Sequence, residues 1–282
     1  MRPFGTSLRG VAVPVALVVL HTACASAQPS ASASMSTLDG ASCPVADWSP
    51  APPIRADSLS DYQRSVDVRQ RNDWANFARY RDANAALGAP KPGETRVVFM
   101  GNSITDAWAR SFPAMFPGKA YVGRGISGQT TPQMLVRFRP DVIDLKPKAV
   151  VILAGTNDLN ANTGPMTDED IQKNLMSMAE LAKGNGIKVI FSSILPTSAY
   201  HTAERAVPQT TLRPMSRIRA INDWMKQYAA ANGHVYLDYF TAMVDASGVM
   251  KAELTADDLH PNAAGYAIMA PLAQAAIDRA LR

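Results

Sequence analysis

The chain has 282 residues, which is enough for one sizeable hydrophobic core or for two small domains. Its content of 47% hydrophobic and 18% charged residues is typical of ordinary soluble globular proteins. The formal net charge is only +4, and no basic run of the nucleic-acid-binding or membrane-surface type is present. Neither nucleic acid nor an anionic membrane surface is therefore expected as a partner.

The first 27 residues have the pattern of an export signal. Arg2 and Arg9 precede an uncharged apolar run over residues 11–20, and a small-residue A-x-A pattern ends at Ala27. Because the apolar run is too short to span a bilayer, the pattern predicts a signal peptide cleaved after Ala27 and a mature chain without a transmembrane helix. The protein is therefore expected to be exported, either to the periplasm or to the exterior.

Two cysteines bear on this prediction. Cys24 offers an alternative as a lipoprotein anchor, but His21 stands three residues before it, where a lipobox normally carries an aliphatic residue. Cleavage after Ala27 would leave Cys43 as the single cysteine, so neither an intramolecular disulfide nor a cysteine metal cluster could form. It would also remove two arginines and reduce the net charge to +2, from 26 basic and 24 acidic residues.

The next part of the chain divides into a tether and a helical segment. Residues 28–56 are rich in Ser, Ala and Pro without an apolar period, which predicts a flexible tether. Over residues 57–94 apolar residues fall on one broad helical face: Tyr62, Val66, Trp74, Phe77, Tyr80, Ala83 and Leu87. We interpret this segment as an N-terminal helical extension packed on the main domain; an aromatic platform for a ligand is the alternative. Pro90 and Pro92 end the pattern.

A short strand followed by a serine begins the main domain, which we place at residues 95–282. Residues 97–100 form a continuous apolar run of buried-strand length that ends at Gly101, and the residues after it are typical of a helix start. Ser103 at this turn would expose its hydroxyl at the carboxyl edge of the sheet, with its backbone N–H among the first donors of the helix. This place suits a nucleophile, although it also suits a helix N-cap residue.

Strands and helices alternate beyond residue 96. Strands are expected at residues 97–100, 119–122, 149–153, 187–192 and 234–238, and helices at residues 104–111, 130–144, 167–183, 214–232 and 262–281. Pro271 predicts a kink or a fresh helix start within the last helix. The alternation indicates an α/β fold in which helices cover both faces of a five-stranded parallel sheet, with the site at the carboxyl ends of the strands.

The loop after the second strand carries glycines in the spacing G-x-G-x-x-G, at Gly123, Gly125 and Gly128. This spacing is typical of dinucleotide-binding turns. It follows the second strand rather than the first, and the next strand ends without an acidic residue for a ribose, so nicotinamide or flavin binding is the weaker interpretation. The other interpretation is a close approach of backbone N–H groups, that of Gly128 above all, to an anionic centre.

Two further loops carry polar side chains. The third strand ends in residues 154–158, where Asn157 could donate an amide N–H to an oxyanion or stabilise an Asx turn. The loop over residues 254–262 holds Asp257 and His260 three residues apart. At this spacing the carboxylate can accept the Nδ1–H of the ring and leave Nε2 free to accept a proton. Among the four histidines, His260 is the best-placed base.

These four blocks together resemble the SGNH, or GDSL-type, hydrolase family, whose signature is a Ser, a Gly, an Asn and a His in that order, with an Asp three residues before the His. The matching residues are Ser103, Gly128, Asn157 and His260, with Asp257 as the Asp. The resemblance spans residues 95–282. It departs from the family name at Asn102, which stands where that name has an Asp, and the neighbouring Asp258 leaves open which carboxylate orients His260.

The resemblance implies a flavodoxin-like, three-layer α/β/α sandwich and an exported serine esterase that needs neither a metal nor an organic cofactor. In such an enzyme Ser103 attacks an ester carbonyl, His260 takes its proton, and Asp257 holds the imidazole. The oxyanion would be bound by the backbone N–H groups of Ser103 and Gly128 and by the side chain of Asn157.

The substrate is expected to be a small-molecule or carbohydrate ester. The polar segment over residues 196–214, with Tyr200, His201 and Arg213, follows the fourth strand and is expected to border the site. Its polarity favours a short acyl group such as acetyl on a polar alcohol. Three alternatives stay open: a periplasmic O-acetyltransferase with the same triad, an acylhydrolase of the lysophospholipase or thioesterase type, and a catalytically silent carbohydrate-binding module.

Overall fold

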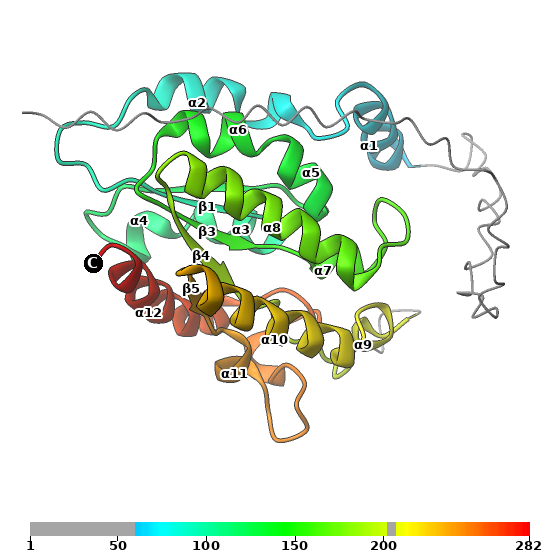
Figure 1. Cartoon of the computed structure of the whole chain (residues 1–282). Coiled ribbons are helices and arrows are strands. Elements are labelled where there is room, and N and C mark those ends of the chain that lie inside the picture. The colour runs from blue at the N-terminus through cyan, green and yellow to red at the C-terminus, as the bar shows by residue number, and fades with distance from the viewer. Residues whose placement is uncertain (1–59, 202–206) are drawn as a thin grey trace, which may run out of the picture. The chain divides into compact units, whose positions relative to one another are not determined.

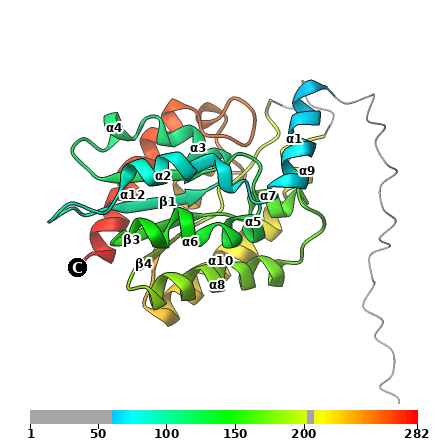
Figure 2. The ribbon, with the colours of Figure 1, turned by 90° about the horizontal axis from the view of Figure 1, so that it is seen from above.

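The structure is a computed structural model, and it describes residues 60–201 and 207–282. The expected signal peptide (1–27), the expected tether (28–56) and both cysteines lie outside these residues. Figure 1 shows a central parallel sheet between layers of helices, and Figure 2 shows the same layers from above. Within the described part of the chain, no helix combines the length and the apolar character needed to cross a membrane.

The sheet has five strands, all parallel, in the order β2-β1-β3-β4-β5. They are β1 (Val97–Gly101), β2 (Tyr121–Gly125), β3 (Ala149–Leu153), β4 (Lys188–Ser192) and β5 (Val235–Leu237). The predicted three-layer α/β fold with a five-stranded parallel sheet is therefore confirmed. Strand β1, which leads to Ser103, lies between β2 and β3 and is buried along its whole length, as its continuous apolar run requires.

The helices form two layers and an N-terminal group. One face of the sheet packs against α5 (Thr131–Val136), α6 (Phe138–Asp141), η3 (Ile143–Leu145), α7 (Thr156–Leu159), α8 (Asp168–Gly184) and α10 (Met215–Asn232). The other face packs against α3 (Ser103–Ala109), α4 (Phe112–Met115), α11 (Phe240–Met243), η5 (Ala252–Leu254) and α12 (Ala263–Ala280). The N-terminal group is α1 (Asp61–Asn72), η2 (Phe77–Tyr80) and α2 (Arg81–Leu87), and α9 (Gln209–Leu212) precedes α10.

An aromatic cluster fixes α3, the helix that begins at Ser103. The ring of Phe99 on β1 lies 5.7 Å from that of Trp108 on α3 and 4.7 Å from that of Phe112 on α4. Trp108 also stacks on Tyr266 of α12 at 5.5 Å, and the Tyr266 hydroxyl donates to the carbonyl of Ile104 at 2.9 Å. Each such ring pair adds about 0.5–1.5 kcal/mol beyond the burial of its area. The start of α3 is thereby held against both the sheet and the last helix.

Two sequence-based boundaries are wrong for reasons that the structure makes plain. Strand β2 runs to Gly125 rather than ending at residue 122. Its glycines are needed for packing, because a Cβ on Gly125 would lie 2.2 Å from the backbone nitrogen of Asp106 in α3. The helix expected over residues 130–144 is divided into α5, α6 and η3. Pro140 has no N–H to donate to the carbonyl of Val136, so the helix is interrupted between Val136 and Phe138.

Of two further helical predictions, the structure confirms one and contradicts the other. Helix α8 begins with the expected capping box, in which Thr167 and Asp170 bond each other's backbone N–H groups. Pro271 lies inside α12, which runs without interruption from Ala263 to Ala280, so the expected fresh helix start is wrong. The buried residues Met269 and Ala273 on either side of Pro271 explain why packing outweighs the lost hydrogen bond.

The N-terminal segment is not one amphipathic helix. Asn76 has a left-handed backbone (φ 54°), which separates α1 from η2 and breaks the expected stripe. Trp74 and Phe77 are 42% and 40% exposed, whereas Tyr80 is buried. The segment is joined to the sheet edge by Tyr80, whose hydroxyl donates to the carbonyl of Gly125. In both views α2 lies beside α6 (Figures 1 and 2).

Candidate active site

The turn between β1 and α3 presents the hydroxyl of Ser103 to His260. Ser103 is the first residue of α3, and its Oγ lies 2.9 Å from Nε2 of His260. The N-cap is Asn102, whose Oδ1 accepts the backbone N–H of Ile104 at 3.0 Å. The helix is therefore capped by the residue before the serine, and the N-cap alternative for Ser103 is wrong. Asn102 keeps the acceptor oxygen that an Asp would supply at this position.

The imidazole of His260 is held from its other side by Asp257. Oδ2 of Asp257 lies 2.7 Å from Nδ1 of His260, and Oδ1 accepts the backbone N–H groups of His260 and Leu259 at 2.7 and 3.1 Å. Partial burial by itself would raise the pKa of the Asp257 carboxyl, but the hydrogen bonds from the His260 ring and from the two N–H groups outweigh it and hold the pKa far below the usual range.

The ionised state of Asp257 decides the tautomer of His260. A carboxylate can only accept hydrogen bonds, so Nδ1 of the neutral imidazole must carry the proton. Nε2 is then an acceptor that faces the Ser103 hydroxyl. Both side chains are partly open to solvent, with 37% of His260 and 31% of Asp257 exposed. A reacting group can therefore reach the nitrogen that would take the serine proton.

Asp258 has hydrogen-bond partners different from those of Asp257. It is buried, with a left-handed backbone (φ 66°), and its carboxylate accepts the Ser198 hydroxyl at 2.6 Å and the backbone N–H groups of Tyr200 and His201 at 2.9 Å each. The ring of His260 donates its Nδ1–H to Asp257, not to Asp258. Asp258 thus holds residues 198–201 against the loop that carries the histidine.

Gly128 lies in the loop after β2, and Asn157 lies in α7, the short helix that follows β3; β2 and β3 are the two strands that flank β1. Asn157 is buried, and its Nδ2 donates to the carbonyl of Gln129 at 2.9 Å. Gly128 is exposed and has a left-handed backbone (φ 82°), a conformation that favours glycine. Its carbonyl accepts Nδ2 of Asn162 at 2.9 Å. Hydrogen bonds thus join residues 128–129 to residues 157–162, and one of them fixes the orientation of the Asn157 amide.

The three residues proposed to border a substrate have different environments. Tyr200 is 52% exposed and its hydroxyl donates to Oδ2 of Asp245 at 2.5 Å; His201 is also exposed. Arg213 is buried, and its guanidinium donates to the carbonyl of Thr156 at 2.9 Å and to Gln209. Arg213 therefore holds the residue before Asn157, and its part in substrate binding stays a prediction.

Several residues that support the site carried no clear signal in the sequence. Gln129 receives the Asn157 amide, and Asp158 is buried and accepts the N–H and hydroxyl of Thr131 at 2.8 and 2.5 Å. Burial raises the pKa of the Asp158 carboxyl, with the Thr131 hydrogen bonds opposing it. The capping box of Thr130 and Gln133 was the one readable sign, since it marks where the loop after β2 must end.

The geometry joins a hydroxyl, an imidazole and a carboxylate in one hydrogen-bonded series at the carboxyl edge of the sheet. Such a series can transfer the hydroxyl proton to the ring while the oxygen attacks an electrophilic carbon. The amide of Asn157 and the loop that carries Gly128 lie at the same edge of the sheet, where a developing negative charge could be stabilised.

Comparison with known proteins identifies the family of this chain. The model of the GDSL-like lipase/acylhydrolase family matches residues 95–268. A GDSL-like lipase from Bacteroides thetaiotaomicron is 44% identical, with a TM-score of 0.68 over 74% of this chain and 100% of that chain. A protein from Bacteroides fragilis, assigned as an acylhydrolase, is 43% identical, with a TM-score of 0.69 over 74% of this chain and 99% of that one.

Two weaker similarities complete the comparison. A catalytic variant of an acetylxylan esterase from Geobacillus stearothermophilus is 21% identical, with a TM-score of 0.53 over 65% of this chain and 94% of that one, and it shares the fold. An uncharacterised lipoprotein of Bacillus subtilis is 37% identical over 75 residues, which are 26% of this chain and 31% of that protein. The chain therefore matches about a third of the length of that curated relative.

Proposed function

Because the chain belongs to the GDSL-like lipase/acylhydrolase family, and is therefore an ester hydrolase of the GDSL type, we propose that it works through a triad of Ser103, His260 and Asp257. The observation that supports this is the continuous series Asp257 Oδ2–His260 Nδ1 at 2.7 Å and His260 Nε2–Ser103 Oγ at 2.9 Å. The partial exposure of Ser103, His260 and Asp257 is consistent with access of a small ester to the hydroxyl.

The first half of the reaction transfers the acyl group to the serine. Oγ of Ser103 attacks the carbonyl carbon while Nε2 of His260 takes the hydroxyl proton, and Asp257 stabilises the imidazolium that forms. The carbonyl π electrons move to the oxygen of a tetrahedral intermediate. When the C–O bond to the alcohol breaks, His260 returns its proton to the departing alkoxide and an acyl-serine remains.

The oxyanion of that intermediate would be met by three donors. Ser103, as the first residue of α3, has a backbone N–H without an intrahelical acceptor. Gly128 would supply a second backbone N–H. Asn157 has two amide hydrogens, of which one is donated to Gln129, so the second can serve the oxyanion. Donors held in place before the reaction lower the barrier because they need no reorganisation.

The second half releases the acid. A water molecule gives one proton to Nε2 of His260 and attacks the acyl carbonyl, and the same donors stabilise the second tetrahedral intermediate. Its collapse breaks the bond to Oγ, which regains the proton from His260. The net change is an ester and water converted to an acid and an alcohol.

The assignment of the nucleophile is tested with a Ser103→Ala variant. Nitrophenyl acetate turnover should fall about 10⁴-fold or more, because the triad acts as a unit. A fluorophosphonate probe should label the wild type at Ser103 and leave the variant unlabelled. Ser177→Ala on α8 is the control and should keep both properties. Wild-type turnover by Ser103→Ala would overturn the proposal, and a wild type that forms no adduct would favour the silent binding module.

We propose a short acyl group on a polar or carbohydrate alcohol as the substrate. In support, Asp258 lies in the same loop as His260 (residues 254–262) and accepts the backbone N–H groups of the exposed Tyr200 and His201. The surface next to His260 is therefore polar. A series of nitrophenyl esters should show kcat/KM falling as the acyl chain lengthens beyond a few carbons. A preference for long chains would instead indicate a lipid-directed acylhydrolase. Transfer of acetyl to an added sugar in place of water would indicate the transferase.

We also propose that the enzyme is exported. The N-terminal pattern of residues 1–27 and the similarity to a protein named as a lipoprotein support this. Mass spectrometry of the secreted or periplasmic protein should show a mature N-terminus at Gln28. A lipid-modified N-terminus at Cys24 would show the anchored alternative instead, and an intact Met1 in the cytoplasm would contradict export.

A further inference from the structure

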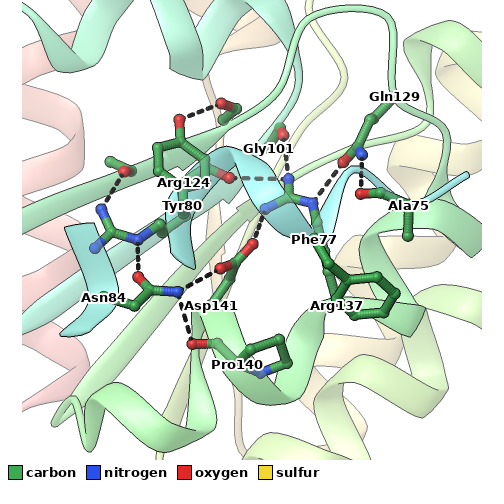
Figure 3. Close-up of polar contacts among 12 residues, drawn as sticks. Ala75, Phe77, Tyr80, Asn84, Gly101, Arg124, Gln129, Arg137, Pro140 and Asp141 are labelled. Carbon is green, nitrogen blue, oxygen red and sulfur yellow. Dashed lines mark hydrogen bonds and ion pairs between the residues drawn. The ribbon is translucent and has the colours of Figure 1, made fainter. Parts of the chain in front are cut away.

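A buried arginine joins the pieces of backbone from which the site is built. Arg137, between α5 and α6, has no exposed surface. Its guanidinium donates to Oε1 of Gln129 at 2.5 Å, to the carbonyl of Gly101 at 3.0 Å, to the carbonyl of Arg124 at 2.9 Å and to Oδ2 of Asp141 at 2.8 Å. Figure 3 shows this side chain at the centre of the network. Asp141 balances the charge, which would otherwise be costly to bury.

The partners of Arg137 lead directly to the proposed oxyanion donors. Gly101 ends β1, two residues before Ser103. Gln129 follows Gly128, and the carbonyl of Gln129 is the acceptor that orients the amide of Asn157. The planar guanidinium thus holds β1, β2 and the loop after β2 in one fixed relation, which a flexible point charge could not do.

The N-terminal segment closes the same network from outside. Nε2 of Gln129 donates to the carbonyl of Ala75 at 2.7 Å, and Nε2 of Gln133 donates to the carbonyl of Trp74 at 2.8 Å. The hydroxyl of Tyr80 donates to the carbonyl of Gly125, three residues before Gly128. The N-terminal segment therefore hydrogen-bonds to Gly125 at the end of β2, to Gln129 in the loop that follows, and to Gln133 in α5.

Figure 3 also shows how the network returns to Asp141. Nε of Arg124 donates to Oδ1 of Asn84 at 2.7 Å, and Nδ2 of Asn84 donates to Oδ1 of Asp141 at 2.7 Å. The guanidinium of Arg124 lies 4.8 Å from the centre of the Tyr80 ring. Buried polar groups in such a closed network restrain one another, so a change at one member is transmitted to the others.

Arg96 shows that burial of an arginine does not by itself imply a role in the site. It is 2% exposed and donates to the carbonyls of Gly88 and Leu145 at 2.8 and 2.9 Å. Its acceptors lie at the amino end of β1, which Arg96 directly precedes, opposite to the end that carries Ser103. Arg96 therefore serves the fold in the same chemical manner but away from the site.

We propose that Arg137, acting through Gln129, is a positioning residue for the oxyanion hole, and that Tyr80 of the N-terminal segment completes its action on the same loop. The inference rests on the proposed function, since it takes Ser103, Gly128 and Asn157 as the donors. It adds that the positions of these donors are fixed by residues on the interior side of the loop, which do not contact the substrate. Loss of the placement lowers transition-state stabilisation while substrate binding is kept.

The first test compares Arg137→Lys with Arg96→Lys. A lysine keeps the positive charge but loses the planar fork in both places. Arg137→Lys should lower kcat for nitrophenyl acetate about 10- to 100-fold with KM changed by less than about threefold, as expected when oxyanion donors are displaced. Arg96→Lys should lower the melting temperature about as much as Arg137→Lys does, and it should leave kcat of the folded enzyme within about twofold of wild type.

Affinity for a boronic acid gives a readout that a purely structural role would not move. The boronate that forms on Ser103 is tetrahedral and anionic, so it requires the same donors as the intermediate. Its inhibition constant should rise in Arg137→Lys by about the factor by which kcat falls, and should stay unchanged in Arg96→Lys.

A milder pair guards against loss of folding in the first variant. Tyr80→Phe removes the hydroxyl that bonds the Gly125 carbonyl, and Tyr121→Phe removes a hydroxyl that donates to Gln274 at 2.9 Å. Tyr80→Phe should lower kcat about three- to tenfold, and this effect should shrink when Asn157→Ala is already present, because both changes act on one site. Tyr121→Phe should leave kcat unchanged in either background.

The outcomes separate the two proposals. If Ser103→Ala retains turnover, the triad itself is wrong. If Ser103→Ala is inactive while Arg137→Lys and Tyr80→Phe keep wild-type kcat and boronate affinity, the triad stands and the positioning role is refuted. Equal losses of kcat in Arg96→Lys and Arg137→Lys would also refute it, since a general loss of stability would then explain both.

Discussion

Replacing Asp257 by asparagine would alter the site while changing hardly any volume. Oδ1 of Asp257 accepts the backbone N–H groups of Leu259 and His260, and an amide oxygen can keep both bonds. The amide nitrogen would then stand where Oδ2 now lies, 2.7 Å from Nδ1 of His260. Because an NH₂ group donates, Nδ1 must become an acceptor, and the proton of the neutral ring moves to Nε2.

The reversed tautomer would disable the base. Nε2 lies 2.9 Å from Oγ of Ser103, and with a proton on it this nitrogen cannot accept the serine proton. The charge that stabilises the imidazolium is lost as well. We expect kcat to fall about 10⁴-fold, the loss typical when the orienting carboxylate of such a triad becomes an amide. At about 1.36 kcal/mol per tenfold, this raises the barrier by about 5.4 kcal/mol.

Asp258→Asn is the matched control in the next residue. Its left-handed backbone (φ 66°) is one that asparagine tolerates well, so the change alters charge and hydrogen bonding without straining the backbone. The amide would face the N–H of His201, which now bonds Oδ2 at 2.9 Å, and one charged acceptor would be lost in a buried place. We expect a cost of about 1–3 kcal/mol in unfolding free energy. Turnover per folded molecule should stay within about fivefold of wild type, because the His260 ring keeps its partner.

The assay is steady-state hydrolysis of nitrophenyl acetate at neutral pH, with thermal unfolding measured on the same samples. The expected pattern is that Asp257→Asn loses nearly all activity, together with the stability that its ionised carboxylate contributes at neutral pH, whereas Asp258→Asn loses stability with little loss of activity. An Asp257→Asn enzyme within tenfold of wild-type kcat would refute the tautomer reasoning. So would a folded Asp258→Asn enzyme as inactive as Asp257→Asn.

Three further predictions follow from single contacts. Asn157→Ala should lower kcat about 10²- to 10³-fold with little change in KM, because an oxyanion donor acts only in the transition state; steady-state kinetics in which KM alone rises would contradict this. The lowered pKa of Asp257 means that its carboxylate stabilises the fold above the unfolded pKa of about 3.9 and that this contribution is lost as the pH falls below it. Urea denaturation should therefore show the wild type losing more unfolding free energy than Asp257→Asn between about pH 5 and about pH 2. Gly125→Ala should lower the melting temperature by at least about 5 °C, because its Cβ would lie 2.2 Å from the nitrogen of Asp106; Gly184→Ala, with open space around it, should not.

Much of the fold could be predicted because its signals are local. The strand before Ser103 is buried on both faces, so its residues are all apolar and the run stops at a glycine. Asp257 and His260 lie in one turn, so their spacing along the chain nearly determines their distance in space. The capping box at the start of α8 is likewise contained within one helical turn.

What the sequence could not predict depends on distant partners. Arg137 resembles any helical arginine until the sheet and the N-terminal segment surround it. Arg213 follows a polar loop, and its burial depends on a carbonyl at Thr156, far away in the chain. The stripe through Trp74 and Phe77 fails at one left-handed residue, Asn76, whose conformation no periodic pattern reveals. Charge and periodicity describe a residue's surface preference, whereas its tertiary partners decide its place.

The long separation between the proposed nucleophile and the proposed base has a consequence for how the chain becomes active. Ser103 and His260 are 157 positions apart, and the serine lies at the end of a strand inside the sheet, whereas the histidine comes just before the last helix. The nucleophile is therefore synthesised early and the base late. Contacts between distant positions are slow to form. During refolding, the helical circular dichroism should recover before esterase activity does, and with this triad a growing polypeptide has no esterase activity until its C-terminal helix docks.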